Sequence, residues 1–448
     1  MTPSLVDRLR HRLAGPLAVA VAVVVAVTVG ALVPSKPAAA VIAGLVVLAF
    51  GVTLVDPLFL PTLAVPFVVV ASRVGEESTS ISLSDVALAV ALLPALVLVH
   101  RRFSPAMSSL VLLNLVYQFT ALFAVAAHPF RANVVEWFHA WLLIGGALVV
   151  GWAIGRDGRG PIAIRILVWA IVLVAVGTLV TAVGQYLRRD FGPIYPTWPF
   201  PMHKNLAGPL LGLGAAITFV RPAWVGWRPV TAKLLFVLFV VTALLTQSRQ
   251  ALIGLGVVLV LVVVQAPREQ RRSRLIVVLV LGLLAFSASL VQDQIASGDR
   301  FNSVYQRISW FSDAIEVWSM DPWLGQGLRW WYRPEHAGAV QPPNAELEVL
   351  TSVGILGLVG FLVMFGGAFL VLRRVPREFG ELALVVLASR LVQAQFDLFW
   401  VAVLGSIPWL VTGVCLGAHA WTAQHEHDDA ASWVADGPLA PARRLVAR

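Results

Sequence analysis

The sequence predicts an all-α polytopic membrane protein with about 12 to 14 transmembrane helices. Of its 448 residues, 58% are hydrophobic and only 13% are charged, against roughly 45–50% and about 25% in an ordinary soluble domain. Apolar stretches long enough to cross about 30 Å of hydrocarbon recur from Leu13 to Trp421. These two observations exclude a soluble globular protein and a protein held by a single anchor.

The net charge of +9, from 33 Lys and Arg against 24 Asp and Glu, is explained by topology. Cytoplasmic loops of membrane proteins collect Lys and Arg, and these also favour the anionic inner leaflet. Membrane lipids are therefore the expected surroundings, and no nucleic-acid partner is expected. The single cysteine, Cys415, cannot form an internal disulfide and is expected to be a packing residue.

The chain opens with three arginines ahead of an apolar run. This run is longer than the core of a signal peptide, and the next apolar segment follows almost at once, so we expect an uncleaved first helix with its basic end in the cytoplasm. Some later stretches are short or flanked by proline and could fuse or re-enter the membrane. The stretches expected to form helices are residues 14–33, 38–55, 58–72, 83–99, 107–127, 134–154, 161–187, 205–220, 231–247, 250–265, 274–291, 347–372, 381–396 and 399–421.

With the N-terminus inside, this alternation places most basic clusters on the cytoplasmic side, as the positive-inside rule requires. The cations left on the outer side need another reason to be there. They include Arg188, Arg189, Lys204, Arg249, Arg300, Arg307, Arg329 and Arg333.

The longest connection, residues 291–346, is expected to be a structured lid on the outer side. It is far longer than the usual 4 to 6 residues of a connection, yet it carries too many large aromatic side chains for a disordered chain. Residues 307–320 have apolar residues at helical spacing, which predicts an amphipathic helix. The shorter outer segment 188–204 contains four prolines, which favour a stiff, extended cover.

Three parts of the chain are therefore expected. Residues 1–190 form N-terminal transmembrane helices, and residues 191–421 form a transmembrane core that includes the outer loop. Residues 422–448, which are polar and rich in small side chains, are expected to form a disordered cytoplasmic tail.

Arginines near the outer face are the candidates for an anion site. Arg249 lies between two apolar runs, where it is either an interfacial arginine that reaches the headgroups or a guanidinium that binds phosphate. Arg307 begins the predicted loop helix. If the two converge, they could clamp a diphosphate and stabilise the charge that develops as it leaves. Lys204, Arg188 and Arg189 could assist, although anchoring at the interface also explains them.

Polar residues before the apolar run 205–220 are candidates for substrate binding. His203 and Asn205 lie at the expected start of a helix, where a polar cap is the alternative. No partner stands at metal-ligand spacing to His203, so no metal site is expected. The turn at Pro322–Gly327, which includes Gln326, could expose backbone amides to an oxyanion.

Carboxylates on the outer side are the candidates for a general base. Asn344 and Glu346 open a spanning helix, where capping and the helix dipole suffice to explain them. A partly buried Glu346 could also accept a hydroxyl proton. Asp397 is another outer carboxylate, which could bind sugar or pair with an arginine.

Taken in order from about Pro199 to Leu416, these segments resemble the O-antigen ligase and polymerase family, membrane glycosyltransferases related to the bacterial lipopolysaccharide ligase. The pieces that carry the resemblance are His203–Gly208, Ser248–Arg249 with Ala251 and Gly254, Arg307–Ala314, Pro322–Gly327, and Asn344–Leu347 leading into Val353–Leu358.

The resemblance implies a C-type glycosyltransferase fold in the bacterial cytoplasmic (inner) membrane. It implies transfer of a glycan, outside that membrane, from undecaprenyl diphosphate to the hydroxyl of a glycan or glycolipid acceptor. Such a cell-surface polysaccharide ligase or polymerase would invert the anomeric carbon and need no metal or cofactor. Arg249 and Arg307 match the family arginines thought to hold the diphosphate.

One departure concerns the acceptor side of the family pattern. The family usually has a histidine directly before the asparagine of its last motif, whereas this chain has Pro343 before Asn344. Glu346 is the first substitute for that histidine and His336 the second, because Glu346 lies at the helix opening. Two other classes stay open: a transporter or flippase of lipid-linked glycan, and a non-catalytic scaffold.

Overall fold

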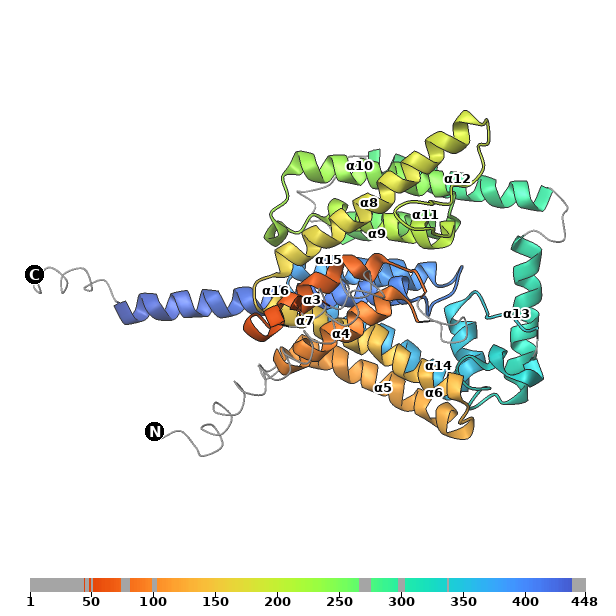
Figure 1. Cartoon of the computed structure of the whole chain (residues 1–448), viewed down its shortest axis with the longest axis horizontal. Coiled ribbons are helices and arrows are strands. Elements are labelled where there is room, and N and C mark those ends of the chain that lie inside the picture. Colours follow the sequence, from red (N-terminus) through yellow and green to blue (C-terminus); the bar gives the residue numbers. More distant parts are fainter. Residues whose placement is uncertain are drawn as a thin grey trace, which may run out of the picture. The chain divides into compact units, whose positions relative to one another are not determined.

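The computed structural model describes residues 44, 48–49, 51–73, 81–98, 103–265, 275–296, 303–336 and 338–436. The chain divides into two compact units, Met1–Leu60 and Pro61–Arg448, and the site lies wholly in the second. The expected helix 14–33 and most of 38–55 lie outside the described residues. Within the second unit, the regular secondary structure of the described residues is helical, apart from an isolated bridge between Arg73 and Ser82 (Figure 1).

The helices begin and end close to the expected bounds. They are α3 (Phe59–Ala64), α4 (Leu83–Leu98), α5 (Pro105–Ala127), α6 (Arg131–Trp141), α7 (Ala147–Arg156), α8 (Gly160–Leu187), α9 (Lys204–Val220), α10 (Pro229–Thr246), α11 (Arg249–Gln265), α12 (Leu275–Ala296), α13 (Ser303–Met320), α14 (Ala345–Leu372), α15 (Arg377–Gln393) and α16 (Ala402–Asp436).

Among the described residues, six helices are long and apolar enough to cross a membrane. They are Pro105–Ala127, Arg131–Arg156, Gly160–Leu187, Pro229–Thr246, Ala345–Leu372 and Ala402–Glu426. Five shorter apolar helices accompany them: Phe59–Val69, Leu83–Val97, Lys204–Val220, Arg249–Gln265 and Val278–Ser289. The chain is therefore an all-helical polytopic membrane protein. The last helix continues to Asp436, so it includes the first part of the segment expected to be a tail.

Small residues set the closest helix contacts, as is usual where lipid cannot drive helices together. α7 and α16 pack backbone to backbone: a Cβ added to Gly151 would lie 2.1 Å from the Leu410 carbonyl oxygen, and one on Gly413 would lie 2.2 Å from that of Leu148. The outer segment after α8 is not helical, as its prolines predict. It packs on α8 so closely that a Cβ on Gly177 would collide with the carbonyl of Trp198.

The loop helix predicted over 307–320 is confirmed as α13. It runs across the end of the bundle, transverse to α9 and α10 (Figure 1). The segment that follows it docks on α14 where that helix is broken at Gly354, whose φ of 65° and ψ of −167° are not helical. At this break, the amides of Gln326 and Gly327 donate to the carbonyls of Thr351 and Ser352, each at 2.9 Å. The loop between α12 and α14 is thus folded onto the apolar helices.

Candidate functional site

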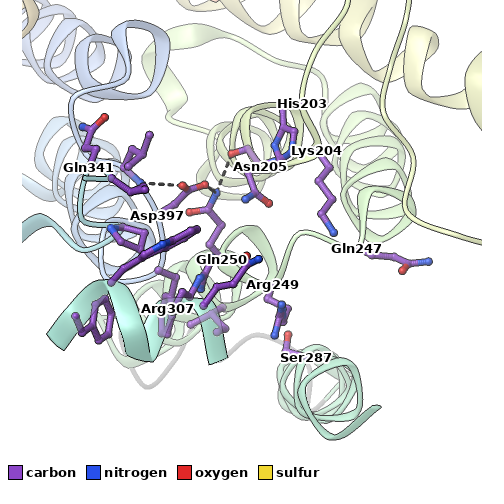
Figure 2. Close-up of a pocket in the computed structure, with 18 of the residues that line it drawn as sticks. His203, Lys204, Asn205, Gln247, Arg249, Gln250, Ser287, Arg307, Gln341 and Asp397 are labelled. Carbon is purple, nitrogen blue, oxygen red and sulfur yellow. Dashed lines mark hydrogen bonds between the residues drawn. The ribbon is translucent and has the colours of Figure 1, made fainter. Parts of the chain in front are cut away.

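A cavity of about 960 Å³ lies among the starts of α9 and α11, the sides of α12 and α13, and the loops before α14 and α16. Figure 2 shows its polar side chains arranged around a common space. Its lining consists of Tyr195, His203, Lys204, Asn205, Gln247, Arg249, Gln250, Ile253, Ser287, Ala288, Gln306, Arg307, Trp310, Phe311, Val340, Gln341, Pro343, Phe396, Asp397 and Leu398.

Three cations from distant parts of the sequence meet in this cavity. Lys204 is the first residue of α9, Arg249 is the first residue of α11, and Arg307 lies in the first turns of α13. The lining also holds one carboxylate, that of Asp397. The N-termini of α9 and α11 add partial positive charge at the same place. The cavity is therefore suited to an anion with more than one negative charge.

Close packing of two helices brings Lys204 and Arg249 together. A Cβ added to Gly208 of α9 would lie 2.5 Å from the Cβ of Ser248, directly before α11, so only glycine permits this approach. Gln247 ends α10 in the left-handed conformation, with φ of 51°, and the chain reverses within two residues. In Figure 2, Gln247 points away from the other labelled side chains, whereas Arg249 points toward Arg307 and Ser287.

Partial burial affects the Arg307 guanidinium. Partial burial lowers the pKa of Arg307 from its ordinary value, and the nearby carboxylate of Asp397 opposes this shift. A guanidinium remains protonated at any physiological pH. Arg307 therefore keeps its charge while it has lost part of its hydration, and such a cation binds an anion more strongly than an exposed one does.

The carboxylate of Asp397 is held by a chain of hydrogen bonds. Gln250, which is buried, donates from Nε2 to Asp397 Oδ2 at 2.7 Å and to the Asn205 carbonyl at 2.8 Å (Figure 2). The amide of Leu398 donates to Asp397 Oδ1 at 2.9 Å. Gln250 thereby links α11, the start of α9 and the loop before α16.

A buried arginine behind the cavity fixes the loop that carries Asp397. Arg390 of α15 donates from Nη2 to the carbonyls of Leu398, at 2.7 Å, and Phe399, at 2.5 Å, and its guanidinium lies over the Phe399 ring at 5.1 Å. Carbonyl oxygens of a loop need such donors when water is excluded. Arg390 therefore fixes the backbone beside Asp397.

His203 caps α9 and also lines the cavity. Its Nδ1 accepts a hydrogen bond from the Asn205 amide at 3.2 Å, so the capping alternative is confirmed. Burial lowers the pKa of His203, with Lys204 acting in the same direction and Asp397 opposing. The ring is therefore neutral at neutral pH, which keeps Nδ1 available as an acceptor.

Two arginines proposed to assist do not line the cavity. Arg188 and Arg189 follow the end of α8 and are exposed. They lie in the turn that leads into the proline-rich segment, where Arg189 has φ of 60°.

The three residues expected to act on the acceptor also lie outside the lining. Glu346 Oε1 accepts from Gln395 Nε2 at 2.8 Å, and Asn344 caps α14 by accepting from the Leu347 amide at 3.0 Å. His336 packs edge-on against Trp330, with ring centroids 5.1 Å apart. The carboxylate that the structure places in the cavity is Asp397 and not Glu346.

The expectation that the turn at Pro322–Gly327 offers free amides to an oxyanion is wrong. Besides the two amides that pair with α14, the Leu324 amide donates to the Asp321 carboxylate at 3.1 Å and the Gly325 amide to the Asp321 carbonyl at 2.9 Å. Gln326 is buried and does not line the cavity. The turn serves to dock the outer loop.

Several lining residues escaped the sequence analysis. Gln250 and Gln341 contribute amides, while Tyr195, Trp310 and Phe311 contribute aromatic surface. The sequence signal for Gln250 was a glutamine directly after an arginine at the start of an apolar run, because a side-chain amide buried in such a run needs hydrogen-bond partners. Nothing local distinguishes Gln341.

Comparison with known proteins shows what the central segment of the chain is similar to. Residues 234–365 match the sequence profile of the family described as O-antigen ligase. The chain is also 28% identical over 225 residues to an O-antigen ligase of Pseudomonas aeruginosa strain PAO1, which covers 47% of this chain and 52% of that protein. The chain thus matches about half the length of this relative. Arg249, Arg307 and the start of α14 all lie inside the matched profile. The resemblance inferred from the motifs is confirmed, since the central segment of this membrane protein matches the O-antigen ligase family profile and the chain is similar to a distant relative of that name.

Proposed function

We propose that the protein is a membrane glycosyltransferase that moves a glycan from an undecaprenyl-diphosphate carrier to a hydroxyl group of a glycan or glycolipid acceptor. The observation that carries the proposal is the meeting of Lys204, Arg249 and Arg307 around one cavity with a single carboxylate. Two of these cations lie in the family segment.

The cations are suited to holding the diphosphate of the donor. A guanidinium binds phosphate oxygens through two parallel hydrogen bonds, and an ammonium adds a point charge. The transition state places growing negative charge on the leaving diphosphate, and preorganised cations stabilise that charge. The volume of about 960 Å³ lies at the upper end of ordinary ligand pockets, so it can hold the diphosphate together with sugar units.

Asp397 is the proposed general base. The acceptor oxygen attacks the anomeric carbon of the donor sugar and passes its proton to the carboxylate of Asp397. The bond from that carbon to the phosphate oxygen breaks, and the diphosphate leaves with the electron pair. One displacement of this kind inverts the anomeric carbon. The side-chain cations supply the charge stabilisation, so the proposed mechanism includes no metal. The hydrogen bonds from Gln250 and the Leu398 amide hold the carboxylate in place.

The proposal includes a topology and a fold. The cavity would open on the outer side of the bacterial inner membrane, covered by α13, within a bundle of 12 to 14 spanning helices of the C-type glycosyltransferase kind. The direction of the helices supports this orientation, because the basic connections at residues 156–165 and 373–377 lie at the ends of helices opposite to the cavity.

The test is reconstitution of the purified protein with carrier-linked oligosaccharide and candidate acceptors. Arg249→Ala and Arg307→Ala should each lower transfer by about 10- to 100-fold, from the roughly 1.5–3 kcal/mol of a hydrogen bond to a charged group. Arg188→Ala, which removes an exposed arginine outside the cavity, is the matched control and should retain transfer.

Two further variants test which carboxylate is the general base, and the products of the assay distinguish a transferase from a transporter. Asp397→Asn should abolish most transfer while Glu346→Gln keeps it. Full activity of both cavity arginine variants would reject the diphosphate site. Movement of the carrier across the bilayer without any glycosylated product would show a transporter instead.

A further inference from the structure

A second cavity, of about 150 Å³, lies beside the large one. It is formed by residues from α6, the loop after α13, the segment around Arg73 and Ser82, and the start of α16. Gln341 and Leu398 line both cavities. Its complete lining is Ala71, Arg73, Ser82, Glu136, His139, Arg329, Trp331, Tyr332, Gln341, Leu398, Trp400, Val401, Ala402 and Val403.

Its charged groups form a closed network. The guanidinium of Arg329 pairs with the carboxylate of Glu136. His139 faces Glu136 through Nδ1, at 3.2 Å, and Asp85 through Nε2, at 3.0 Å. Asp85 in turn accepts from the amide and the hydroxyl of Ser82, each at 2.8 Å. Asp85 and Glu136 are each only 3% exposed, so the two carboxylates are largely buried, while Glu136, His139 and Arg329 still line the cavity.

The charge of this network balances internally. Two carboxylates face one guanidinium and one imidazole whose two nitrogens each lie against a carboxylate. Arg73 adds a positive charge only at the exposed rim. The large cavity has the opposite character, with three cations against one carboxylate. The small cavity therefore offers hydrogen-bonding groups without the net charge that would select a phosphate.

The remaining walls are apolar, with three aromatic side chains among aliphatic ones, and the volume of the cavity is small. Trp331, Tyr332 and Trp400 face the cavity. Rigid aromatic surface combined with fixed polar groups is suited to a ring that is apolar on its faces and rich in hydroxyls at its edge. A volume of 150 Å³ equals about five waters at roughly 30 Å³ each, which is the space of about one sugar ring.

The small cavity lies beside the proposed general base, which is where a sugar of the acceptor would be needed. Leu398 follows Asp397 directly and donates its amide to that carboxylate. Gln341, on the other shared wall, is fixed by a hydrogen bond to Glu348 at 2.6 Å. A ring in the small cavity would thus lie next to the proposed general base, because Leu398 adjoins Asp397 and lines both cavities.

We propose that the small cavity is a binding subsite for one uncharged saccharide ring of the acceptor. This inference rests on the proposed glycan transfer and adds to it the place and the chemical class of the acceptor group. The ring enters past Tyr332, which is 52% exposed. The large cavity is left to the donor diphosphate and its sugars.

The test measures sugar binding by the full-length protein without any donor. Purified protein in nanodiscs is titrated with glucose, galactose, mannose and N-acetylglucosamine, and binding is followed by saturation-transfer difference NMR. Tyr332→Ala removes one aromatic wall, and Ala402→Met fills the cavity while leaving every aromatic and charged side chain in place. Trp323→Ala removes a 68% exposed tryptophan of the same outer loop that lines neither cavity and serves as the matched control.

The expected result is that at least one sugar binds, and that Tyr332→Ala and Ala402→Met each weaken it at least tenfold. Trp323→Ala should bind it within twofold of the wild type. Absence of sugar binding to the wild type, unchanged binding in Tyr332→Ala and Ala402→Met, or an equal loss of binding in Trp323→Ala would each overturn the proposal.

These outcomes are separate from those of the transfer assay. A protein that binds sugar in this pattern but transfers no glycan refutes the proposed function. A protein that transfers glycan but fails the sugar test keeps its function and loses only this subsite.

Discussion

The break in α14 at Gly354 should be essential for seating the outer loop, and Gly354→Ala tests this. With φ of 65° and ψ of −167°, the residue lies in a region that is essentially restricted to glycine. A Cβ added there would lie 2.1 Å from the Trp323 carbonyl oxygen and 2.5 Å from the Leu324 nitrogen. Both contacts are with backbone, so no side-chain rotation relieves them.

The size of the effect follows from the contacts that would be lost. Four backbone hydrogen bonds join the loop to the break: Gln326 and Gly327 donate to α14, and the amides of Ile355 and Leu356 donate to Pro322 and Trp323, at 2.9 and 3.3 Å. At roughly 0.5–1.5 kcal/mol each, docking is worth about 2–6 kcal/mol. Alanine in this conformation costs about 1–3 kcal/mol in backbone strain, before the collision is counted.

Limited trypsin proteolysis at Arg329 is the assay, because this residue lies in the docked segment and is paired with Glu136. A loss of about 2 kcal/mol raises the undocked population roughly 30-fold, since 1.36 kcal/mol is a factor of ten. Cleavage should accelerate by at least that factor. Gly366→Ala in the same helix, where a Cβ meets nothing within 4 Å, should cleave like the wild type. Equal cleavage rates in all three proteins would refute the role of the break.

Three further predictions concern single groups. Asp397→Asn should lower the rate constant for transfer by about 10²- to 10⁴-fold, the usual share of a general base, with little change in donor affinity measured by direct binding. Arg329→Met should destabilise the fold by about 3–5 kcal/mol because it removes the guanidinium partner of the buried Glu136 carboxylate and leaves that carboxylate only His139, and thermal unfolding should show a smaller loss when Glu136→Leu is added. The pKa of His203 is lowered in the folded protein, so as the pH falls through about 6.5 the unfolded chain takes up a proton first and stability declines. His203→Asn keeps a cap for α9 and should remove this part of the acid loss in a melting-temperature series against pH.

The helices could be predicted from the sequence because their signals are local. Apolar runs bounded by basic or proline-containing turns gave the bounds of α8, α9 and α11 to within a few residues. The helical spacing of Phe311, Ile315 and Trp318 predicted α13 although it is not an apolar run. In each case the helix follows from the pattern of apolar residues within one segment of the chain.

The cavity could be predicted only in part, because it depends on contacts between segments. The outer-side excess of arginine singled out Arg249 and Arg307, and the structure places both in the cavity. The sequence near Glu346 and Asp397 did not show which of these carboxylates lines the cavity, because both lie beside helix ends. In the structure Gln395 donates to Glu346, whereas Gln250 donates to Asp397, which lines the large cavity.

The turn at Pro322–Gly327 was also misinterpreted because its contacts are with another segment. The sequence of a Gly-containing turn is the same whether its backbone amides are free to bind a ligand or donate to a neighbouring helix. The deciding feature is the broken conformation of Gly354, which frees the carbonyls of Thr351 and Ser352 to accept them.

Docking at this break should matter unequally for the two cavities. The docked loop contributes Arg329, Trp331 and Tyr332 to the small cavity, whereas the cations of the large cavity come from α9, α11 and α13. Undocking by Gly354→Ala should therefore weaken the binding of an acceptor sugar much more than the binding of a donor diphosphate. Equal weakening of both would mean that α13 moves together with the loop, and that the two cavities open as one.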